Sequence, residues 1–296
     1  MERMCQLAGV SRASYYRNLE ARAPGEEEMA MRSVIQEAAL QHRRRYGYRR
    51  VAADLRRRGL RVNHKRVLRI MREDNLLAIR YRKYILTTNS QHDCPVYLNL
   101  AARLSVAGVN QLWLADITYI RLRTEFVFLA VVIDRFSRKV IGWALDRTLA
   151  ARVAVAALQQ AIDRRQPPPG VVHHSDQGIQ YASADYVGVL GANHMVPSMS
   201  RPANPYDNAA CESFLKTLKQ EEIYCNQYRD FEELSAHLEE FLENYYNRQR
   251  LHSALGYRTP EEFERDTSSA ATPGETQPAA TMQYFTGPNR EVPTAP

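Results

Sequence analysis

Three carboxylates stand out because of where they lie in the chain. Asp116 sits between Ala115 and Ile117 in an apolar, strand-like stretch. A carboxylate buried in such a place must be hydrogen-bonded, ion-paired or bound to a cation. Asp176 follows the strand-like stretch VVHHS, and ligand-binding groups gather where the strands of an α/β sheet end. Each position fits a functional carboxylate or an ordinary structural aspartate.

Glu212 is the third candidate and lies one turn into a helix predicted to begin near Asp207. An acidic residue in a first turn also complements the helix dipole, so its position alone is not diagnostic. The intervals are more informative. There are 59 residues between Asp116 and Asp176, and 35 between Asp176 and Glu212.

Other polar residues nearby have plainer interpretations. Asp134 and Asp146 end predicted strands but do not give the 35-residue interval to Glu212, and we interpret Asp134 as a turn or support residue. His173 and His174 alternate along one strand, so at most one can face the site, and packed histidines are the favoured interpretation. The four cysteines stand far apart, which argues against a structural zinc site.

The ordered motifs around these carboxylates resemble one family, the second-frame products of IS3-family insertion-sequence transposases, which carry a D, D-35-E triad. The resemblance extends over roughly residues 26–263, in WLADITYI, VIDRFSRKVIGW, HHSDQGIQY, NPYDNAACESFLKTLKQE and YYNRQRLHSALGYRTPEEF. It implies a ribonuclease-H-like α/β fold of the integrase-core type, with a mixed five-stranded sheet and helices, preceded by an all-α helix-turn-helix-like region. It also implies a DNA transposase that binds element ends and catalyses metal-dependent strand cleavage and transfer.

The resemblance assigns Asp116, Asp176 and Glu212 as catalytic residues and as ligands of two Mg²⁺ or Mn²⁺ ions. Such hard cations prefer oxygen ligands, and two of them can clamp the attacking and departing oxygens of a phosphoryl transfer. Two alternatives stay open. The chain could be a DNA-binding regulator without activity, or a ribonuclease H type hydrolase, which would leave the helix-turn-helix-like segments unused.

Further DNA-contacting residues are expected around the helix that carries Glu212. Lys216 and Lys219 follow Glu212 by four and seven residues on one helix face and could contact phosphates, although a solvated face is the plainer alternative. Tyr206 and Asn208 at the start of this helix could position the substrate. Farther along, three basic residues could contact DNA or simply carry surface charge: Arg248, Arg250 and His252.

Periodicity predicts the elements that must position these residues. Stretches rich in β-branched and aromatic residues predict strands at residues 111–121, 125–134, 139–146, 171–175 and 194–198. Helical patterns predict helices at residues 150–165, 183–190, 207–222 and 231–245. The first three strands should form an antiparallel meander within a mixed α/β domain, with Trp113 in its core.

Positive charge is concentrated in the amino-terminal part of the chain. Residues 1–83 contain 21 lysines and arginines against 9 acidic residues, whereas the remainder contains 19 against 24. This excess favours a polyanion partner. Gly59 should end one helix and Asn63 should cap the next, which places Asn63, Lys65, Arg66 and Arg69 on a candidate recognition helix, with a plain helical bundle as the alternative.

The sequence therefore predicts a partial helix-turn-helix-like segment at 1–22, a basic DNA-binding domain at 26–83, a connector at 84–108, the catalytic core at 109–225, a helical extension at 226–265 and a disordered tail at 266–296. The expected partners are DNA, as terminal inverted repeats and target, further copies of the chain in a synaptic complex, and an upstream-frame protein as partner or fusion. No apolar run is long enough to span a membrane and no signal peptide is evident, so we expect a cytoplasmic, nucleoid-associated bacterial protein.

Overall fold

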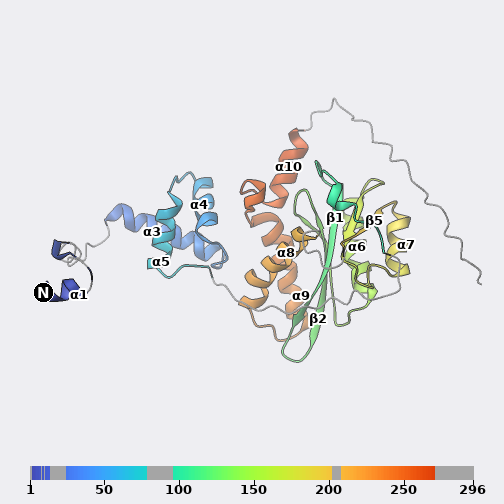
Figure 1. Ribbon diagram of the computed structural model, residues 1–296, viewed down its shortest axis with the longest axis horizontal. Coiled ribbons are helices and arrows are strands. Elements are labelled where there is room, and N and C mark those ends of the chain that lie inside the picture. Colours follow the sequence, from blue (N-terminus) through green and yellow to red (C-terminus); the bar gives the residue numbers. More distant parts are fainter. Residues whose placement is uncertain are drawn as a thin grey trace, which may run out of the picture.

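The computed structural model describes residues 2–7, 9, 11–13, 25–78, 96–201 and 208–270. A helical part and an α/β part follow each other along the chain (Figure 1). They are preceded by α1 (Glu2–Leu7) and by Gly9, whose φ of +62° marks the turn expected from the sequence. In the described residues, no helix is long and apolar enough to cross a membrane.

The helical part consists of α3 (Glu26–Gln41), α4 (Tyr48–Arg57) and α5 (His64–Glu73). Both predicted boundary signals are confirmed. Gly59 adopts a φ of +87° just after α4, and the side chain of Asn63 caps α5 by accepting a hydrogen bond from the backbone N–H of Lys65 at 2.9 Å. The three helices enclose a small core whose fully buried side chains include Ile35, Leu55 and Ile70.

The α/β part is built on a five-stranded mixed sheet in the order β3-β2-β1-β4-β5. The first three strands form the predicted antiparallel meander, and β1, β4 and β5 run parallel. Their bounds are β1 (Leu112–Arg121), β2 (Phe126–Asp134), β3 (Val140–Asp146), β4 (Val172–Ser175) and β5 (Val196–Met199). The predicted fold class is confirmed, and β1 is its central strand.

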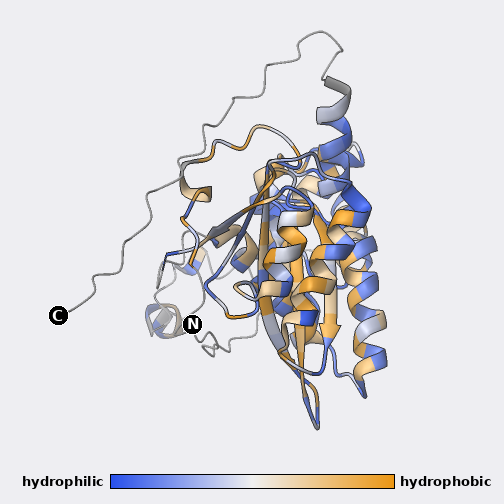
Figure 2. Ribbon diagram, turned by 90° about the vertical axis from the view of Figure 1, so that its right-hand side faces the viewer, coloured by the Kyte–Doolittle hydropathy of each residue, from blue (hydrophilic) through white to orange (hydrophobic). Residues whose placement is uncertain are grey.

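Helices cover both faces of the sheet. On one face α6 (Ala151–Arg165) and α7 (Ala184–Ala192) pack on a cluster that contains the fully buried Trp113. On the other face lie α8 (Ala209–Glu221) and α9 (Phe231–Glu239), against strand residues such as Leu112 and Leu114. Side chains alternate along a strand, so β1 supplies both cores. Figure 2 shows the strands largely in orange, behind helices that carry many hydrophilic residues.

The contact between β3 and α6 depends on Gly142. A Cβ atom at this position would lie 2.2 Å from the carbonyl oxygen of Ala157 and 2.9 Å from the backbone nitrogen of Ala161. Both are backbone atoms of α6, which cannot move aside as a flexible side chain can. Glycine is therefore required here for close approach.

Two segments differ from the sequence prediction. The amphipathic pattern over 231–245 is not one α-helix, because α9 continues as the π-helix η3 (Glu240–Gln249). At the carboxyl-terminal end, α10 (Pro260–Ala270) extends into residues 266–270, which were expected to lack structure. The short helices are η1 (Ala101–Arg103), η2 (Ile223–Cys225) and η4 (Ser253–Leu255). The predicted tail beyond Ala270 lies outside the described residues.

The helical part shares its hydrophobic core with the α/β part. One continuous cluster joins Ile35 and Val51 to Tyr246 and Leu251. Tyr46 lies at the junction, where its fully buried hydroxyl donates to the carbonyl of Gln249 at 3.1 Å and accepts from the N–H of Leu251 at 2.8 Å. The start of α4 is therefore fixed to the end of η3.

Candidate active site

The three predicted catalytic carboxylates come from adjoining elements. Asp116 lies in the middle of β1, and Asp176 directly follows β4, which pairs with β1. Glu212 lies in the first turn of α8, which packs on β1. The start of α8 is fixed to that strand, because Asn208 donates from Nδ2 to the carbonyl of Ala115 at 3.1 Å.

Asp116 occupies an unfavourable place for a negative charge. Its half-buried carboxylate accepts a hydrogen bond from the backbone N–H of Ile117 at 2.8 Å. Burial raises the pKa of Asp116 to about 8, and the negative charges of Asp176 and Glu212 act in the same direction. The pKa of Asp116 thus depends on both other carboxylates.

The thiol of Cys211 gives a second sign that the three carboxylates converge. This side chain is fully buried beside Glu212 at the start of α8. Burial raises its pKa well above the usual range, and the charges of Asp116, Asp176 and Glu212 raise it further. The thiol therefore stays protonated, which does not suit a cysteine nucleophile.

Asp176 and Glu212 differ in their surroundings. Asp176 is half-buried and accepts a hydrogen bond from the N–H of Gly178 at 3.0 Å. A Cβ atom on Gly178 would lie 3.0 Å from the same carboxylate oxygen, so a larger residue would press on the Asp176 side chain. Glu212 is exposed, and partial burial raises its pKa.

Within the described ranges, no group of three His, Cys, Asp or Glu side chains lies close enough together to hold a metal ion as it stands. Asp116, Asp176 and Glu212 thus share a region without forming a closed coordination sphere.

The two lysines of α8 have different environments. Lys219 is half-buried, with its Nζ 5.2 Å from the ring centroid of Tyr119 on β1. Burial lowers its pKa, whereas the neighbouring Asp116 acts in the opposite direction. Lys216 is exposed to solvent. Lys219 is therefore the lysine that lies close to the carboxylates.

The predicted positioning residues at the start of α8 are only partly described. Asn208 is 5% exposed and anchors α8 to β1, so its amide nitrogen is already used structurally. Its buried Oδ1 has no hydrogen-bond partner among the described residues. Tyr206 lies outside them.

The predicted DNA-contacting residues of α5 lie at a surface rich in ion pairs. Arg66 lies 3.6 Å from Glu27 and Arg69 lies 3.2 Å from Glu28, both in the first turn of α3. Lys65 is exposed. Surface ion pairs of this kind are weak enough for a phosphate to replace the glutamate.

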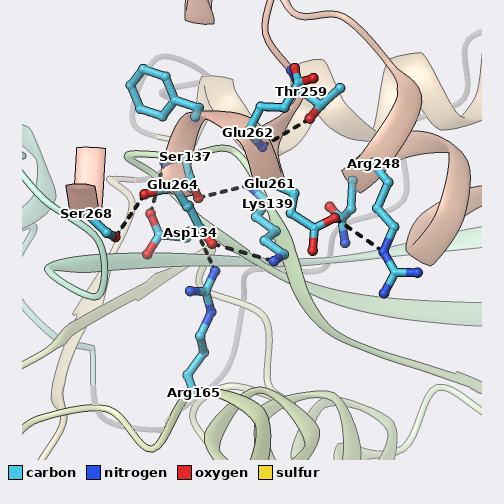
Figure 3. Close-up of polar contacts among 12 residues, drawn as sticks. Asp134, Ser137, Lys139, Arg165, Arg248, Thr259, Glu261, Glu262, Glu264 and Ser268 are labelled. Carbon is cyan, nitrogen blue, oxygen red and sulfur yellow. Dashed lines mark hydrogen bonds and ion pairs between the residues drawn. The ribbon is translucent and has the colours of Figure 1, made fainter. Parts of the chain in front are cut away.

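Asp134 is a support residue, as interpreted from the sequence. It is fully buried at the end of β2 and accepts hydrogen bonds from the N–H groups of Asn110, Phe136 and Ser137 at 2.7, 2.8 and 3.1 Å. Its side chain lies near α10 in Figure 3. Asp134 therefore shapes the turn between β2 and β3.

Both histidines of β4 are packed side chains, also as interpreted. The Nε2 of His173 lies 3.0 Å from the hydroxyl of Tyr186. The ring nitrogens of His174 lie 2.8 Å from the hydroxyl of Ser198 and 3.0 Å from that of Ser200. Burial lowers the pKa of His173 to about 3, so its ring is neutral.

Sequence reasoning missed a buried ion pair at the far end of α8. Arg250 was expected to contact DNA or to carry surface charge, but it is 3% exposed and binds both carboxylate oxygens of Glu221 at 2.8 and 2.7 Å. His252 is also buried, and burial lowers its pKa to about 2. The acidic pair that ends the helix, Glu221 and Glu222, was the available signal.

Family models match most of the chain. An HTH-like domain matches residues 26–84, one integrase core domain model matches residues 107–205, and a second matches residues 193–260. Among solved structures, a chain of the simian T-cell lymphotropic virus intasome in complex with PP2A regulatory subunit B56 gamma is 19% identical, with a TM-score of 0.48 and coverage of 84% of this chain and 80% of that one. The HTLV-2 integrase catalytic core domain in complex with magnesium, in its dimeric form, is 16% identical, with a TM-score of 0.40 and coverage of 53% and 97%.

Curated relatives match at higher identity. The chain is 35% identical over 264 residues to the insertion element IS600 uncharacterized 31 kDa protein of Shigella sonnei, covering 88% of this chain and 97% of that protein. It is 37% identical over 266 residues to transposase InsF for insertion sequence IS3A of Escherichia coli (strain K12), covering 88% and 92%. With this identity, an HTH-like domain and an integrase core, the chain belongs to the IS3 family of insertion-sequence transposases, which are DDE-type polynucleotidyl transferases acting on DNA.

Proposed function

We propose that Asp116, Asp176 and Glu212 are the catalytic carboxylates, which hold two divalent cations, Mg²⁺ or Mn²⁺, while the transposase cleaves an element end and joins it to target DNA. The observation that carries this proposal is electrostatic. Negative charges at the end of β4 and on α8 act on Asp116, and these two together with Asp116 act on the thiol of Cys211. Protonation of Asp116 relieves that repulsion, and a bound cation would relieve it while leaving the carboxylates ionised.

The donor set fits hard divalent cations. All three groups offer carboxylate oxygens, and the nearby histidines of β4 are packed against tyrosine and serine hydroxyls. When bound, the cations would stabilise the attacking and departing oxygens of the phosphoryl transfer. The carboxyl group of Asp116 must give up its proton to serve as a ligand, because its pKa of about 8 keeps it largely neutral near pH 7.

The lysines of α8 supply positive charge beside these groups. Lys219 lies close enough to Asp116 to lower its pKa, which helps that carboxylate to ionise. Lys216 is exposed four residues after Glu212 and can meet a phosphate of the reacting DNA. On α5, Lys65, Arg66 and Arg69 are the proposed contacts to element-end DNA, with Asn63 as the cap that fixes the helix start.

Three isosteric substitutions test the assignment: Asp116→Asn, Asp176→Asn and Glu212→Gln. Each should lower strand transfer on the order of 10³-fold or more while folding and DNA binding persist. Asp185→Asn, which neutralises an exposed carboxylate in the first turn of α7, is the matched control and should retain full activity. Substantial joining by any of the three variants would remove that residue from the proposed set.

Metal dependence is tested on the same preparations. Cleavage and joining of labelled element-end DNA should require Mg²⁺ or Mn²⁺ and should not require zinc. Full activity in excess EDTA would contradict the two-metal mechanism.

We also propose that the active form contains several copies of the chain, because an element has two ends and the described chain offers one such group of carboxylates. An upstream-frame protein, as a partner or as a fusion, belongs to the same proposal. Light scattering with and without element-end DNA tests the copy number. A strand-transfer assay that compares the chain alone with the fusion tests whether the upstream-frame protein is needed.

A further inference from the structure

A basic cavity lies at the junction of the helical part with the α/β part, where Arg50 of α4 contacts Glu221 at the end of α8. Its volume is about 350 Å³. Four arginines and one acidic residue are among the lining side chains. The residues that define this junction cavity are Arg43, Arg44, Arg45, Gly47, Arg50, Ala78, Gln220, Glu221, Cys225 and Asn226.

The acidic groups at the junction are already matched. Glu222 is 1% exposed and pairs with Arg45. Glu221 binds Arg250 through both oxygens, at 2.8 and 2.7 Å, and the guanidinium of Arg50 lies farther from it, at 3.4 Å. The other arginines therefore give the cavity an excess of positive charge.

That excess resides mainly in Arg43, Arg44 and Arg50. The guanidinium of Arg44 donates to the carbonyls of Asn75 and Leu77, at 2.5 and 3.2 Å, which leaves its charge unneutralised. The Nε atoms of Arg44 and Arg50 are buried and have no hydrogen-bond partner among the described residues. Buried donors without acceptors are unusual and indicate that a further acceptor belongs there.

The backbone conformation at the cavity also indicates a binding site. Arg43 and Arg44 adopt φ values of +48° and +57°, so two successive bulky residues occupy the left-handed region. This conformation is unfavourable for such residues, and strain of this kind is concentrated at binding sites. Here it sets two adjacent arginines at the rim of the cavity.

A second cavity provides a contrast. It has a volume of about 400 Å³ and lies between α6, η3 and α10, where each cation has an acidic partner (Figure 3). The pairs are Lys139 and Arg165 with Glu264, Arg164 with Glu243, and Arg248 with Glu261. Each cation of this cavity thus has an ion-pair partner, whereas Arg43 and Arg44 of the junction cavity have no acidic partner among the ion pairs of the described residues.

We propose that the junction cavity binds a backbone phosphate of the DNA on which the transposase acts, through the guanidinium groups of Arg43, Arg44 and Arg50. Guanidinium groups match phosphate oxygens in geometry and in charge. The inference rests on the proposed function, since it presumes that DNA reaches α8. It adds a contact at the opposite end of this helix from Glu212.

The distance along α8 between the carboxylates and the cavity predicts which phosphate of the duplex the cavity binds. Glu212 and Glu221 are nine residues apart, which corresponds to about 14 Å of helix. A duplex lying along α8 would present a phosphate to the cavity roughly four base pairs from the phosphate at the carboxylates, because base pairs rise about 3.4 Å each.

The first experiment measures binding in EDTA, so that no cleavage is needed. Arg43→Asn and the double variant with Arg44→Asn remove guanidinium groups but keep a residue that tolerates the left-handed region. Arg123→Asn, at the exposed turn between β1 and β2, is the matched control for loss of charge. For a random-sequence duplex, the slope of log K against log salt should become shallower by about 0.9 per lost phosphate contact, and the control should keep the slope of the unaltered protein.

The second experiment locates the phosphate. Neutral methylphosphonates are placed singly along an element-end duplex, and affinity is measured for the unaltered protein and for Arg43→Asn. A substitution roughly four base pairs from the cleaved bond should weaken binding by the unaltered protein and have no effect on the variant.

Three outcomes separate the proposals. An unchanged salt slope in a folded double variant that still cleaves DNA overturns the cavity assignment and leaves the proposed function standing. If the unaltered protein fails to cleave with metal present, the failure belongs to the proposed function. Should the double variant melt early because Arg44 also holds the carbonyls of Asn75 and Leu77, Arg43→Asn alone decides, and an unchanged slope for it would overturn the proposal.

Discussion

The two ends of α8 carry acidic side chains in opposite electrostatic situations. In the last turn, and just after it, Glu221 pairs with Arg250 and Glu222 pairs with Arg45. In the first turn, Glu212 lies near Asp116, and no ion pair found in the described residues includes either of them. One helix thus links neutralised carboxylates to carboxylates that repel one another.

The difference separates acidic groups that are neutralised within the chain from those that we propose bind a cation. A buried charge is tolerated when a partner in the same chain neutralises it. Glu222 meets this condition with four partners, namely Arg45, Asn226, Tyr228 and His237. Burial raises the pKa of Asp116, and repulsion from Asp176 and Glu212 raises it further.

The largest expected effect comes from breaking a neutralised pair. Arg250→Met should lower the free energy of unfolding by about 3–5 kcal/mol, because it leaves Glu221 half-buried without its bidentate partner. Arg248→Met is the control two residues earlier, since the exposed Arg248 lies 3.3 Å from Glu261, and it should cost less than about 1 kcal/mol. Urea unfolding measures both. Equal losses would mean that burial does not make the Arg250–Glu221 pair more important for stability than an exposed ion pair.

Divalent cations should stabilise the folded chain by binding at the start of α8, beside Glu212. Adding Mg²⁺ or Mn²⁺ at a hundredfold excess over its Kd should raise the stability of the folded chain by about 2.7 kcal/mol. The gain should shrink in Asp116→Asn and persist in Asp185→Asn. Thermal melting with and without the metal gives the comparison, and an equal gain in all three proteins would place the metal elsewhere.

The metal-free carboxylates should also respond to pH. The pKa of Asp116 in the folded chain, about 8, lies above its ordinary value of 3.8. Its contribution to stability is therefore present below about pH 4 and is lost as the pH rises toward 8. Asp116→Asn should be more stable than the unaltered chain at pH 8, on the order of 1 kcal/mol for a half-buried carboxyl group, and the difference should vanish near pH 4. A constant difference across this range would argue against the raised pKa.

The smallest effect on stability is expected from a substitution on the surface of α5. Arg69→Gln removes ion pairs with Glu28 and Glu73 that solvent already screens, so the melting temperature should not change measurably. If Arg69 contacts DNA as proposed, the affinity for element-end DNA should nevertheless fall. Loss of stability without loss of affinity would reverse the proposed role.

The sequence predicts those features that depend on local pattern. Alternating β-branched residues predict β1 to β3, and short-range signals predict the Asn63 cap and the turn at Gly59. The region of Asp116, Asp176 and Glu212 was also reached from the sequence, because their intervals match a known family. Each of these signals lies within a short stretch or in an ordered set of motifs.

Long-range pairs are harder to predict. The arginines around Tyr46 add to a basic excess that indicates a polyanion, but Arg45 and Arg50 contact Glu222 and Glu221, which lie 177 and 171 residues away. Composition does not reveal such pairing. The π-helix η3 was missed for a related reason, because periodicity alone does not separate it from a continuation of α9.

Gly142 has a consequence for how copies of such an element are recognised as active. Any other residue there would drive its Cβ into the backbone of α6 and force that helix away from β3, with no change to the three proposed catalytic residues. A copy with this single change would still display all three carboxylates at their proper intervals. A genome survey that counts intact triads would score it as a working transposase, whereas the loss of this glycine would identify it as a copy with a disrupted core.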